Sequence, residues 1–456
     1  MIPELLQSQK DYFNTDETKT VSFRKQALKR LKAELIKRET AIISALEKDF
    51  KKPAFESVLT ETQVVLSELE FSIKNINSWA KPKRVMPALM NFPSTDRLYS
   101  EPYGAVLIIA PWNYPYQLAM APLIAAIAAG NTVILKPSEL TTHTADLLNA
   151  IITSVFKPEH VSVVQGGVDV STKLLAQKWD YIFFTGSVNV GKIVAKAAAK
   201  HLTPVTLELG GKNPCIIDAT ANIQLTAKRI VWGKFVNAGQ TCIAPDYILI
   251  HQSKKEAFYK AMRTEIKKAY SNNPKASEDF ARIINQNNFD RLAKMLVNEN
   301  CCIGGETDAK TNYIAPTLID EPKLDCEVMK DEIFGPILPV ISYDDISEID
   351  AIINSYAKPL SLYVFSTDNK KAEKLITKFS FGGGCINDTV IHFVNHRLPF
   401  GGVGNSGIGA YHGKLSFDTF SHKKAVVKKA NWLDLPVRYA PYNGKLKWVR
   451  TVLKWL

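Results

Sequence analysis

Short apolar runs that alternate with helical patterns are the feature that most constrains the fold of this chain. A strand buried on both faces of a parallel sheet appears in a sequence as a continuous apolar run, and helices connect such strands. A first series of runs comprises Ala105–Ala110, Val133–Leu135, Val161–Val164 and Tyr181–Thr185. A second series comprises Cys215–Ile217, Tyr247–His251, Ile337–Ser342 and Leu362–Phe365. The alternation predicts an α/β protein with two doubly wound domains.

Helical patterns also occur outside these two series. Val21–Phe50 and Glu56–Lys81 have apolar side chains at helical spacing, with charged residues between them, as amphipathic surface helices do. Leu118–Gly130 is apolar throughout, but it is shorter than the ~18 residues of a membrane span and contains Pro122, so we expect a buried helix. Met1–Glu4 includes an early acidic residue and no apolar segment follows, so no signal peptide is predicted.

The basic charge of the chain is concentrated at its C-terminal end. The formal net charge is +12, but residues 421–456 contain nine Lys or Arg and one Asp, a net charge of +8, which leaves +4 for the first 420 residues. The sequence has no module that combines basic and aromatic residues for stacking on bases. We therefore expect no nucleic-acid partner.

The six cysteines predict neither a disulfide framework nor a metal site. They form no C-x-x-C pair, and their spacing to the eight histidines matches no zinc-ligand pattern. The cysteines are Cys215, Cys242, Cys301, Cys302, Cys326 and Cys385. This pattern favours the reducing cytoplasm as the location of the protein.

Three residues have side chains suited to acyl chemistry. Cys242 follows Gly239-Gln-Thr at the end of a predicted helix, where a thiolate would be a nucleophile. Glu208 lies in an apolar strand before a glycine pair, and Asn113 lies in a loop bounded by prolines. A carboxylate can act as a general base and an amide can donate to an oxyanion. The alternatives are that Cys242 is a small core residue and that Glu208 is a paired structural charge.

Eight short motifs follow one another along the chain: PWNYP, KPSE, FTGS, LELGGK, GQTC, EIFGP, PFGGVGNSG and YHGK. Their order resembles that of the NAD(P)-dependent aldehyde dehydrogenases, and the resemblance extends from about Leu28 to about Phe420. Within that family the chain is similar to the class 3 branch, which includes fatty and aromatic aldehyde dehydrogenases. The resemblance implies oxidation of a medium- or long-chain aliphatic or an aromatic aldehyde to the carboxylate.

The resemblance also implies a mechanism. Cys242 would form a thiohemiacetal and then a thioester, Glu208 would be the general base for its hydrolysis, and Asn113 would donate to the oxyanion. Asn387 would lie near the reacting centre. The runner-up interpretation is a CoA-acylating enzyme or a thiol hydrolase, in which Cys242 transfers an acyl group without hydride transfer.

The cofactor implied by the resemblance is NAD, with NADP also possible. Lys136 and Glu139 would reach the adenosine ribose, and a carboxylate there should repel the 2′-phosphate of NADP. The turn after Tyr181–Thr185 opens a helix, where backbone N–H groups suit a pyrophosphate. The other cofactor-binding residues implied are Gly186, Ser187, Gly191, Glu332, Phe334 and Phe400.

The family pattern further implies how the chain is divided. Residues 1–81 and 104–207 would form the NAD(P)-binding domain, and residues 208–390 the catalytic domain. A small bridging β-unit, formed by residues 82–103 and 391–420, would mediate a homodimer. Residues 421–456 would then be a basic C-terminal tail.

Two roles are open for the end of that tail. In residues 445–456, Lys447, Arg450 and Lys454 lie on one arc of a helical wheel, and the opposite arc is apolar and contains Trp448. A basic helix with tryptophan on its apolar face suits peripheral contact with an anionic membrane. The alternative is that the apolar face packs on the enzyme body or across a dimer.

Overall fold

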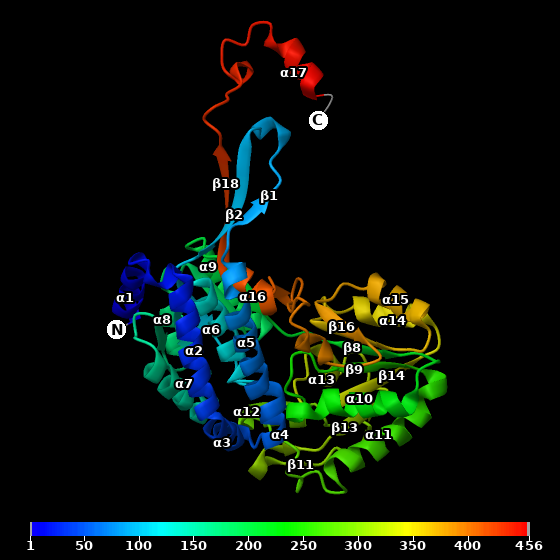
Figure 1. Cartoon of the computed structure of the whole chain (residues 1–456). Helices are drawn as coiled ribbons and strands as arrows, with labels where there is room; N and C mark the ends of the chain where they lie inside the picture. The colour runs from blue at the N-terminus through cyan, green and yellow to red at the C-terminus, as the bar shows by residue number, and fades with distance from the viewer. Residues whose placement is uncertain (1, 454–456) are drawn as a thin grey trace.

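Two α/β halves make up the body of the molecule, each built on one mostly parallel sheet (Figure 1). The computed structural model describes residues 2–453. In the first half the sheet has the strand order β17-β7-β6-β3-β4-β5. Its strands are β3 (Ala105–Ile109), β4 (Thr132–Lys136), β5 (Val161–Val163), β6 (Tyr181–Thr185), β7 (Val205–Glu208) and β17 (Gly407–Ile408). All are parallel except β17, which pairs antiparallel with β7.

Helices cover both faces of this sheet. Its central helix, α6, is apolar on every side and wholly buried, and it ends at Gly130, whose φ of 100° is a conformation that glycine adopts readily. The helices of this half are α1 (Ile2–Asn14), α2 (Val21–Lys37), α3 (Glu39–Phe50), α4 (Ala54–Ser57), α5 (Gln63–Trp79), α6 (Gln117–Ala129), α7 (Thr142–Val155), α8 (Val168–Leu175), α9 (Val188–Ala199) and α16 (Gly413–Thr419). The prediction of a buried helix at residues 118–130 is confirmed.

The second half has a seven-stranded sheet with the order β10-β13-β14-β9-β8-β15-β16. Its strands are β8 (Pro214–Ile217), β9 (Tyr247–His251), β10 (Cys301–Ile303), β13 (Thr317–Asp320), β14 (Ile337–Tyr343), β15 (Ser361–Phe365) and β16 (Gly383–Ile386), and a separate pair is formed by β11 (Thr307–Asp308) and β12 (Tyr313–Ile314). Its helices are α10 (Ile223–Phe235), α11 (Lys255–Tyr270), α12 (Gln286–Lys294), α13 (Glu327–Lys330), α14 (Ile346–Asn354) and α15 (Asn369–Lys378). The predicted α/β class with two doubly wound sheets is confirmed.

All eight strands predicted from apolar runs are present, with ends that differ by at most one residue. The two long N-terminal helices are each interrupted. The first breaks at Arg38, which allows α2 to pack against α5 and α6 while α3 packs against α7. The second is divided into α4, a π-helical turn over Val58–Thr62 and α5.

A third, three-stranded sheet projects from the body as an arm (Figure 1). It has the order β1-β2-β18, with β1 (Lys83–Val85), β2 (Ser94–Pro102) and β18 (Ser421–Lys429). β18 pairs antiparallel with β2 along its whole length, from Ser421 opposite Pro102 to Lys429 opposite Ser94. The expected boundary at residue 421 is therefore wrong, because the first nine residues of the predicted tail are a strand of this arm.

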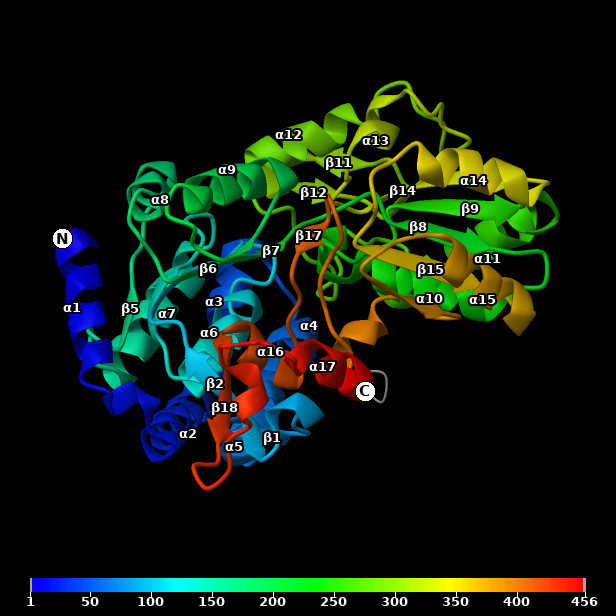
Figure 2. The ribbon, with the colours of Figure 1, turned by 90° about the horizontal axis from the view of Figure 1, so that it is seen from above.

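The expected assignment of residues 391–420 to the bridging unit is also wrong. Within this segment β17 completes an edge of the six-stranded sheet, and α16 packs against α5 and α6. Seen from above, the two halves of the body lie side by side and the segment that carries β17 passes between them (Figure 2). The segment therefore belongs to the body and lies where the two sheets meet.

Helix α17 (Lys445–Leu453) lies at the far end of the arm (Figure 1). The side chains of Leu446 and Trp448 are exposed there. The last three residues of the amphipathic pattern predicted from the sequence, 454–456, lie outside the described residues. Among the helices within residues 2–453, none is long and apolar enough to cross a membrane.

Candidate active site

Cys242 follows a tight left-handed turn at the end of α10. Asn237, Ala238 and Gly239 have φ values of 55°, 52° and 74°. A Cβ at Gly239 would lie 2.3 Å from the carbonyl oxygen of Gly335, so a side chain there would collide with backbone. Glycine at this position allows the chain to reverse and presents Cys242 to the space between the two halves.

The side chain of Gln240 fixes this turn from inside the protein. Its Nε2 donates to the carbonyl oxygens of Asn237 and Arg282, each at 3.0 Å. Its Oε1 accepts from the backbone N–H of Ile284 at 3.0 Å. Gln240 is fully buried, and all three bonds are made in the absence of competing solvent. The glutamine of the GQTC motif is thus a structural support for the cysteine.

Two further side chains hold the backbone around Cys242. Asn213 Nδ2 donates to the carbonyl oxygens of Cys242 at 2.7 Å and Ala244 at 3.1 Å. The hydroxyl of Tyr114 is hydrogen-bonded to Thr241 Oγ1 at 2.6 Å. These contacts come from both halves of the body, so the position of the thiol depends on how the halves pack together.

Cys242 lies in the walls of two cavities. The first has a volume of 520 Å³ and the second 260 Å³. The first is walled mainly by apolar side chains, among them Leu59, Trp232, Val236, Ile391, Phe393 and Val394. The residues common to both walls are Leu118, Cys242, Phe400 and Tyr411. The thiol is therefore accessible both to a large apolar space and to a smaller one.

The second cavity brings together most of the residues that the sequence singled out. They are Asn113, Gly186, Ser187, Glu208, Cys242, Glu332, Phe334 and Phe400. Lys136, Glu139 and Gly191 do not line it. Lys136 ends β4, and its Nζ forms an ion pair with Glu139 Oε2 at 2.6 Å.

The Cys242 thiol is in a setting that opposes ionisation. Burial raises its pKa, and the carboxyl groups of Glu332 and Glu208 raise it further. The thiol is therefore neutral at pH 7 in this arrangement. Activation requires a nearby positive charge or a base.

Glu208 ends β7 and is buried. Neither of its carboxyl oxygens has a hydrogen-bond partner among residues 2–453. Burial raises its pKa well above the ordinary value for glutamate, which disfavours the carboxylate form. A buried carboxyl group with a raised pKa and two oxygens that no described residue hydrogen-bonds is a candidate base.

Asn113 contacts the same turn from the other half of the body. Its Nδ2 donates to the backbone carbonyl oxygen of Gln240 at 3.0 Å, and the backbone carbonyl oxygen of Asn113 accepts from Asn237 Nδ2 at 2.8 Å. An amide nitrogen carries two hydrogens, so one remains for a ligand. This fixed amide lines the second cavity with Cys242.

The strand-to-helix turn between β6 and α9 is tightly packed. Ser187 caps α9, with its side chain accepting from the N–H of Val190 at 3.4 Å. A Cβ on Gly191 would lie 2.7 Å from Leu209 Cδ2 and one on Gly186 would lie 2.5 Å from the ring of Phe184. The two glycines thus allow close packing of the first turn of α9, and Gly186 and Ser187 at its start line the second cavity.

The opposite wall of the second cavity is formed by Glu332 and Phe334. Burial raises the pKa of Glu332 to about 8, with a smaller contribution from Asp246. Its Oε1 is buried and has no hydrogen-bond partner within the described part of the chain. Phe334 packs edge-on against Trp112, with ring centroids 5.3 Å apart. A carboxyl oxygen without a partner, an aromatic edge and a helix N-terminus around one cavity fit a dinucleotide with hydroxyl and phosphate groups.

One expected residue is elsewhere, and others were missed. Asn387 exchanges hydrogen bonds with the backbone of Ser366, at 2.8 and 2.7 Å, and it lines neither cavity, so its expected place near the reacting centre is wrong. Leu118 and Tyr411 lie in both walls but were assigned no role. The YHGK motif marked Tyr411, but no local pattern indicates that it lines both cavities together with Cys242.

Residues 2–426 match the aldehyde dehydrogenase family. The chain therefore belongs to this family, and the predicted assignment is confirmed. Its activity is the NAD(P)-dependent oxidation of aldehydes to carboxylic acids.

Relatives place the chain in the class 3 branch. It is 46% identical to a 4,4'-diaponeurosporen-aldehyde dehydrogenase of Staphylococcus aureus, over 100% of this chain and 99% of the relative. It is 41% identical to the dimeric NADP-preferring aldehyde dehydrogenase of Mus musculus, over 98% and 99%. The solved structure of the substrate-bound state of Staphylococcus aureus AldH superposes with a TM-score of 0.98 at 45% identity, covering 99% of each chain.

Proposed function

We propose that this enzyme oxidises long apolar aldehydes with Cys242 as the nucleophile. One observation carries the proposal: the thiol lies in the wall shared by an apolar cavity and a smaller cavity lined by Glu208, Asn113 and Ser187. A thiol in that position can attack an aldehyde from one side while a cofactor occupies the other.

The chemistry of the chain's own residues follows from this placement. Cys242 adds to the aldehyde carbon, and the resulting oxyanion accepts hydrogen bonds from the free N–H of Asn113 Nδ2 and the backbone N–H of Cys242. A nicotinamide cofactor bound in the second cavity would supply the hydride acceptor, and loss of hydride from the adduct would leave a thioester on Cys242. Glu208 then removes a proton from the water that hydrolyses the thioester.

The cofactor would be held mainly by the second cavity. The N–H groups at the start of α9, after Ser187, would bind the pyrophosphate, and Glu332 would bind the nicotinamide ribose between Phe334 and Phe400. Lys136 and Glu139 would bind the adenosine ribose at the end of β4. The carboxylate of Glu139 favours NAD over NADP, because it repels a 2′-phosphate.

The apolar cavity supports a substrate with a long aliphatic or aromatic body. Its volume of 520 Å³ lies within the range of small-molecule sites, about 300–1,000 Å³. Its walls can bury the apolar part of an aldehyde while the carbonyl group reaches Cys242. The Staphylococcus aureus relative named for 4,4'-diaponeurosporen-aldehyde suggests a large apolar substrate.

A series of aldehydes tests this proposal. Absorbance of NADH should rise when NAD and straight-chain or aromatic aldehydes are added, and kcat/KM should increase with the length of the aliphatic chain. The product should be the free acid, with or without added CoA. Formation of an acyl-CoA would favour the CoA-acylating alternative, and ester or thioester hydrolysis without NADH would favour a thiol hydrolase.

The arm supports a homodimer as the assembly. The arm exposes apolar side chains on β18 and on the loop between β1 and β2, which a second copy could cover. They include Met86, Leu89, Met90, Phe92, Val426 and Val427. The Mus musculus relative is named dimeric, which suggests the same state for this chain.

The tail suggests contact with an anionic membrane surface. Leu446 and Trp448 are exposed on α17, while Lys447 and Arg450 supply positive charge. Full-length protein should co-sediment with anionic vesicles at low salt, and a chain that ends at Asn443 should not. Equal co-sedimentation of the two would leave α17 as a helix that packs across the dimer.

A further inference from the structure

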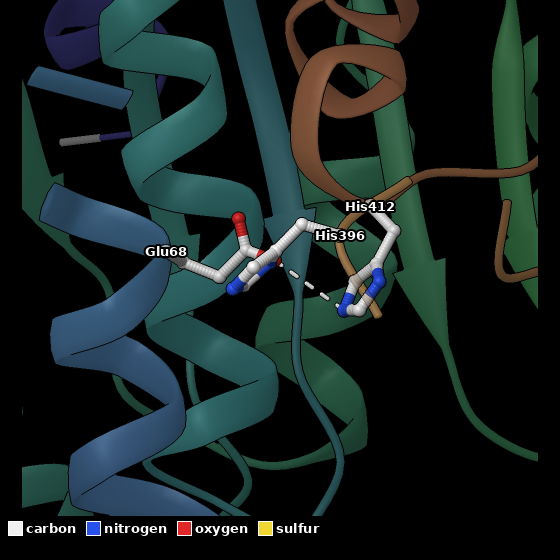
Figure 3. A group of neighbouring side chains, drawn as sticks. All are labelled: Glu68, His396 and His412. Carbon is white, nitrogen blue, oxygen red and sulfur yellow. Dashed lines mark hydrogen bonds and ion pairs between the residues drawn. The ribbon is translucent and has the colours of Figure 1, made fainter. Parts of the chain in front are cut away.

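Three side chains from separate elements converge beside the apolar cavity. Glu68 comes from α5, His396 precedes the PFGGVGNSG motif, and His412 immediately precedes α16. Figure 3 shows the three side chains pointing toward one another. One ligand atom of each lies within 4.8 Å of the other two. Sequence spacing does not indicate this group, because Glu68 is more than 300 residues from the histidines.

The distances suit a small divalent ion with little movement. Glu68 Oε1 lies 2.8 Å from His396 Nδ1 and 3.3 Å from His412 Nε2. Zinc binds histidine nitrogen and carboxylate oxygen at about 2.0–2.2 Å, so the ligand atoms of a tetrahedral site lie about 3.4 Å apart. Small side-chain rotations would bring all three atoms to that spacing.

The surroundings resemble those of a built site. Glu68 and His412 are each 5% exposed. The other ring nitrogen of His396, Nε2, is hydrogen-bonded to Ser67 Oγ at 3.0 Å, and its ring stacks on Phe71 at 5.1 Å. Histidine ligands of metal ions commonly have such a second partner, which fixes the orientation of the ring.

The contacts within the group leave a place for an ion. His396 Nδ1 and Glu68 Oε1 are within hydrogen-bond distance at 2.8 Å, so an ion bound there would take the place of the hydrogen that they share. The Nδ1 of His412 is buried without a hydrogen-bond partner among residues 2–453.

We propose that Glu68, His396 and His412 bind one transition-metal ion of the zinc type. Two histidines and a carboxylate are a ligand set that zinc uses when a fourth position stays open. Both histidines line the 520 Å³ cavity, so the open position faces the path of the aldehyde. A bound ion would therefore obstruct that cavity. The effect of the ion on the aldehyde reaction rests on the proposed function, whereas metal binding itself does not.

Cobalt(II) added to the full-length Cys242→Ser chain is the direct probe. Equilibrium dialysis should give one cobalt ion per chain, and the visible spectrum should contain the bands of a tetrahedral ion with nitrogen and oxygen ligands. Loss of one ligand, in His396→Asn or Glu68→Gln, should weaken binding at least 10–100-fold, roughly what loss of an outer partner alone costs. His143→Asn, which changes an exposed histidine elsewhere, should bind as before.

Absence of a tetrahedral spectrum in the Cys242→Ser chain would overturn the proposal, whatever the substitutions at His396 and Glu68 show. Undiminished cobalt binding by both His396→Asn and Glu68→Gln would also overturn it. In the enzyme with Cys242 intact, zinc should raise the KM for the aldehyde and leave the KM for NAD unchanged, and His396→Asn should remove that effect. Equal inhibition of the His396→Asn enzyme would assign the inhibition to the catalytic thiol, and the claim about the cavity would fail. A chain without dehydrogenase activity would still give the cobalt spectrum, so the two proposals fail separately.

Discussion

At the scale of single residues, the burial of Cys242 opposes its proposed role as a nucleophile. A buried thiol with a raised pKa is a poor nucleophile, and the carboxyl groups of Glu208 and Glu332 hold that pKa up. Burial also raises the pKa values of both carboxyl groups, that of Glu332 to about 8, which disfavours their charged forms. Positive charge brought into the second cavity would favour both the thiolate and the carboxylates. The site is thus arranged to ionise when that cavity is filled.

Replacing Cys242 with serine should abolish NADH formation from aldehyde, because a hydroxyl group without an adjacent base is a far weaker nucleophile. NAD binding should be retained, and quenching of protein fluorescence would measure it. Cys326→Ser changes a thiol outside both cavities and should keep wild-type activity. Full activity of Cys242→Ser would remove this residue from the mechanism.

Glu208→Gln should separate the two halves of the reaction. Hydride transfer in the first turnover should persist, whereas the steady-state rate should fall about 10²-fold or more, because the thioester loses its general base. Rapid-mixing absorbance would show a burst of NADH that then stalls. In the wild-type enzyme the raised pKa of Glu208 predicts that deacylation becomes faster as the pH rises towards that pKa, since the carboxylate fraction grows. An intact steady state in Glu208→Gln would exclude Glu208 as the base.

Glu139→Gln should narrow the preference for NAD over NADP. Glu139 is partly exposed and is paired with Lys136, so removal of its charge should change the discrimination by about 1–2 kcal/mol. The measurement is the ratio of kcat/KM for the two cofactors. An unchanged ratio would mean that Glu139 does not contact the ribose.

At the scale of elements, apolar strands were predictable and polar or glycine-rich ones were not. The β3 strand is apolar and buried at all five positions, so its run is visible in the sequence. The β16 strand begins with two glycines, and the short apolar run of β18, Ala425–Val427, lies between two pairs of lysines, so neither strand stands out as predominantly apolar. β18 is a strand because β2 supplies a partner edge, and this long-range pairing leaves no local signal.

The turn before Cys242 depends on Gly239, and Gly239→Ala tests how much. The substitution places a Cβ 2.3 Å from the carbonyl oxygen of Gly335 and also strains a backbone with φ of 74°. We expect kcat to fall more than tenfold and the free energy of unfolding to fall by about 1–3 kcal/mol. Gly444→Ala has a similar φ of 76° with nothing within 4 Å, so it isolates the backbone strain. Equal effects of the two substitutions would show that the contact with Gly335 does not matter.

At the scale of the whole molecule, the exposed apolar tip of the arm predicts assembly. Charging it with Met86→Glu and Met90→Glu together should convert a dimer to a monomer, since both side chains are exposed and would be desolvated on association. Sedimentation velocity would measure the change. Val168→Glu alters an equally exposed apolar side chain on α8 and should leave the dimer intact. A dimer that survives the double substitution would place the interface elsewhere.

The sequence indicated the residues of the site better than the division of the chain. Cys242, Glu208 and Asn113 lie beside recognisable motifs, and the structure places them around one cavity. The limits of the arm were misplaced because residues 391–420 and 421–429 are adjacent in sequence but join different sheets. Nor could local patterns show that Leu118 and Tyr411 lie in both walls, since that depends on how the two halves pack.

The apolar character of the larger cavity gives the reaction a direction. A neutral aldehyde gains free energy when its apolar body leaves water for these walls. The acid formed at Cys242 ionises, and a carboxylate loses hydration when it lies against walls that are mainly apolar. The cavity that binds the aldehyde therefore binds the carboxylate product more weakly. Ionisation of the newly formed acid thus favours its release and leaves the enzyme ready for its next turnover.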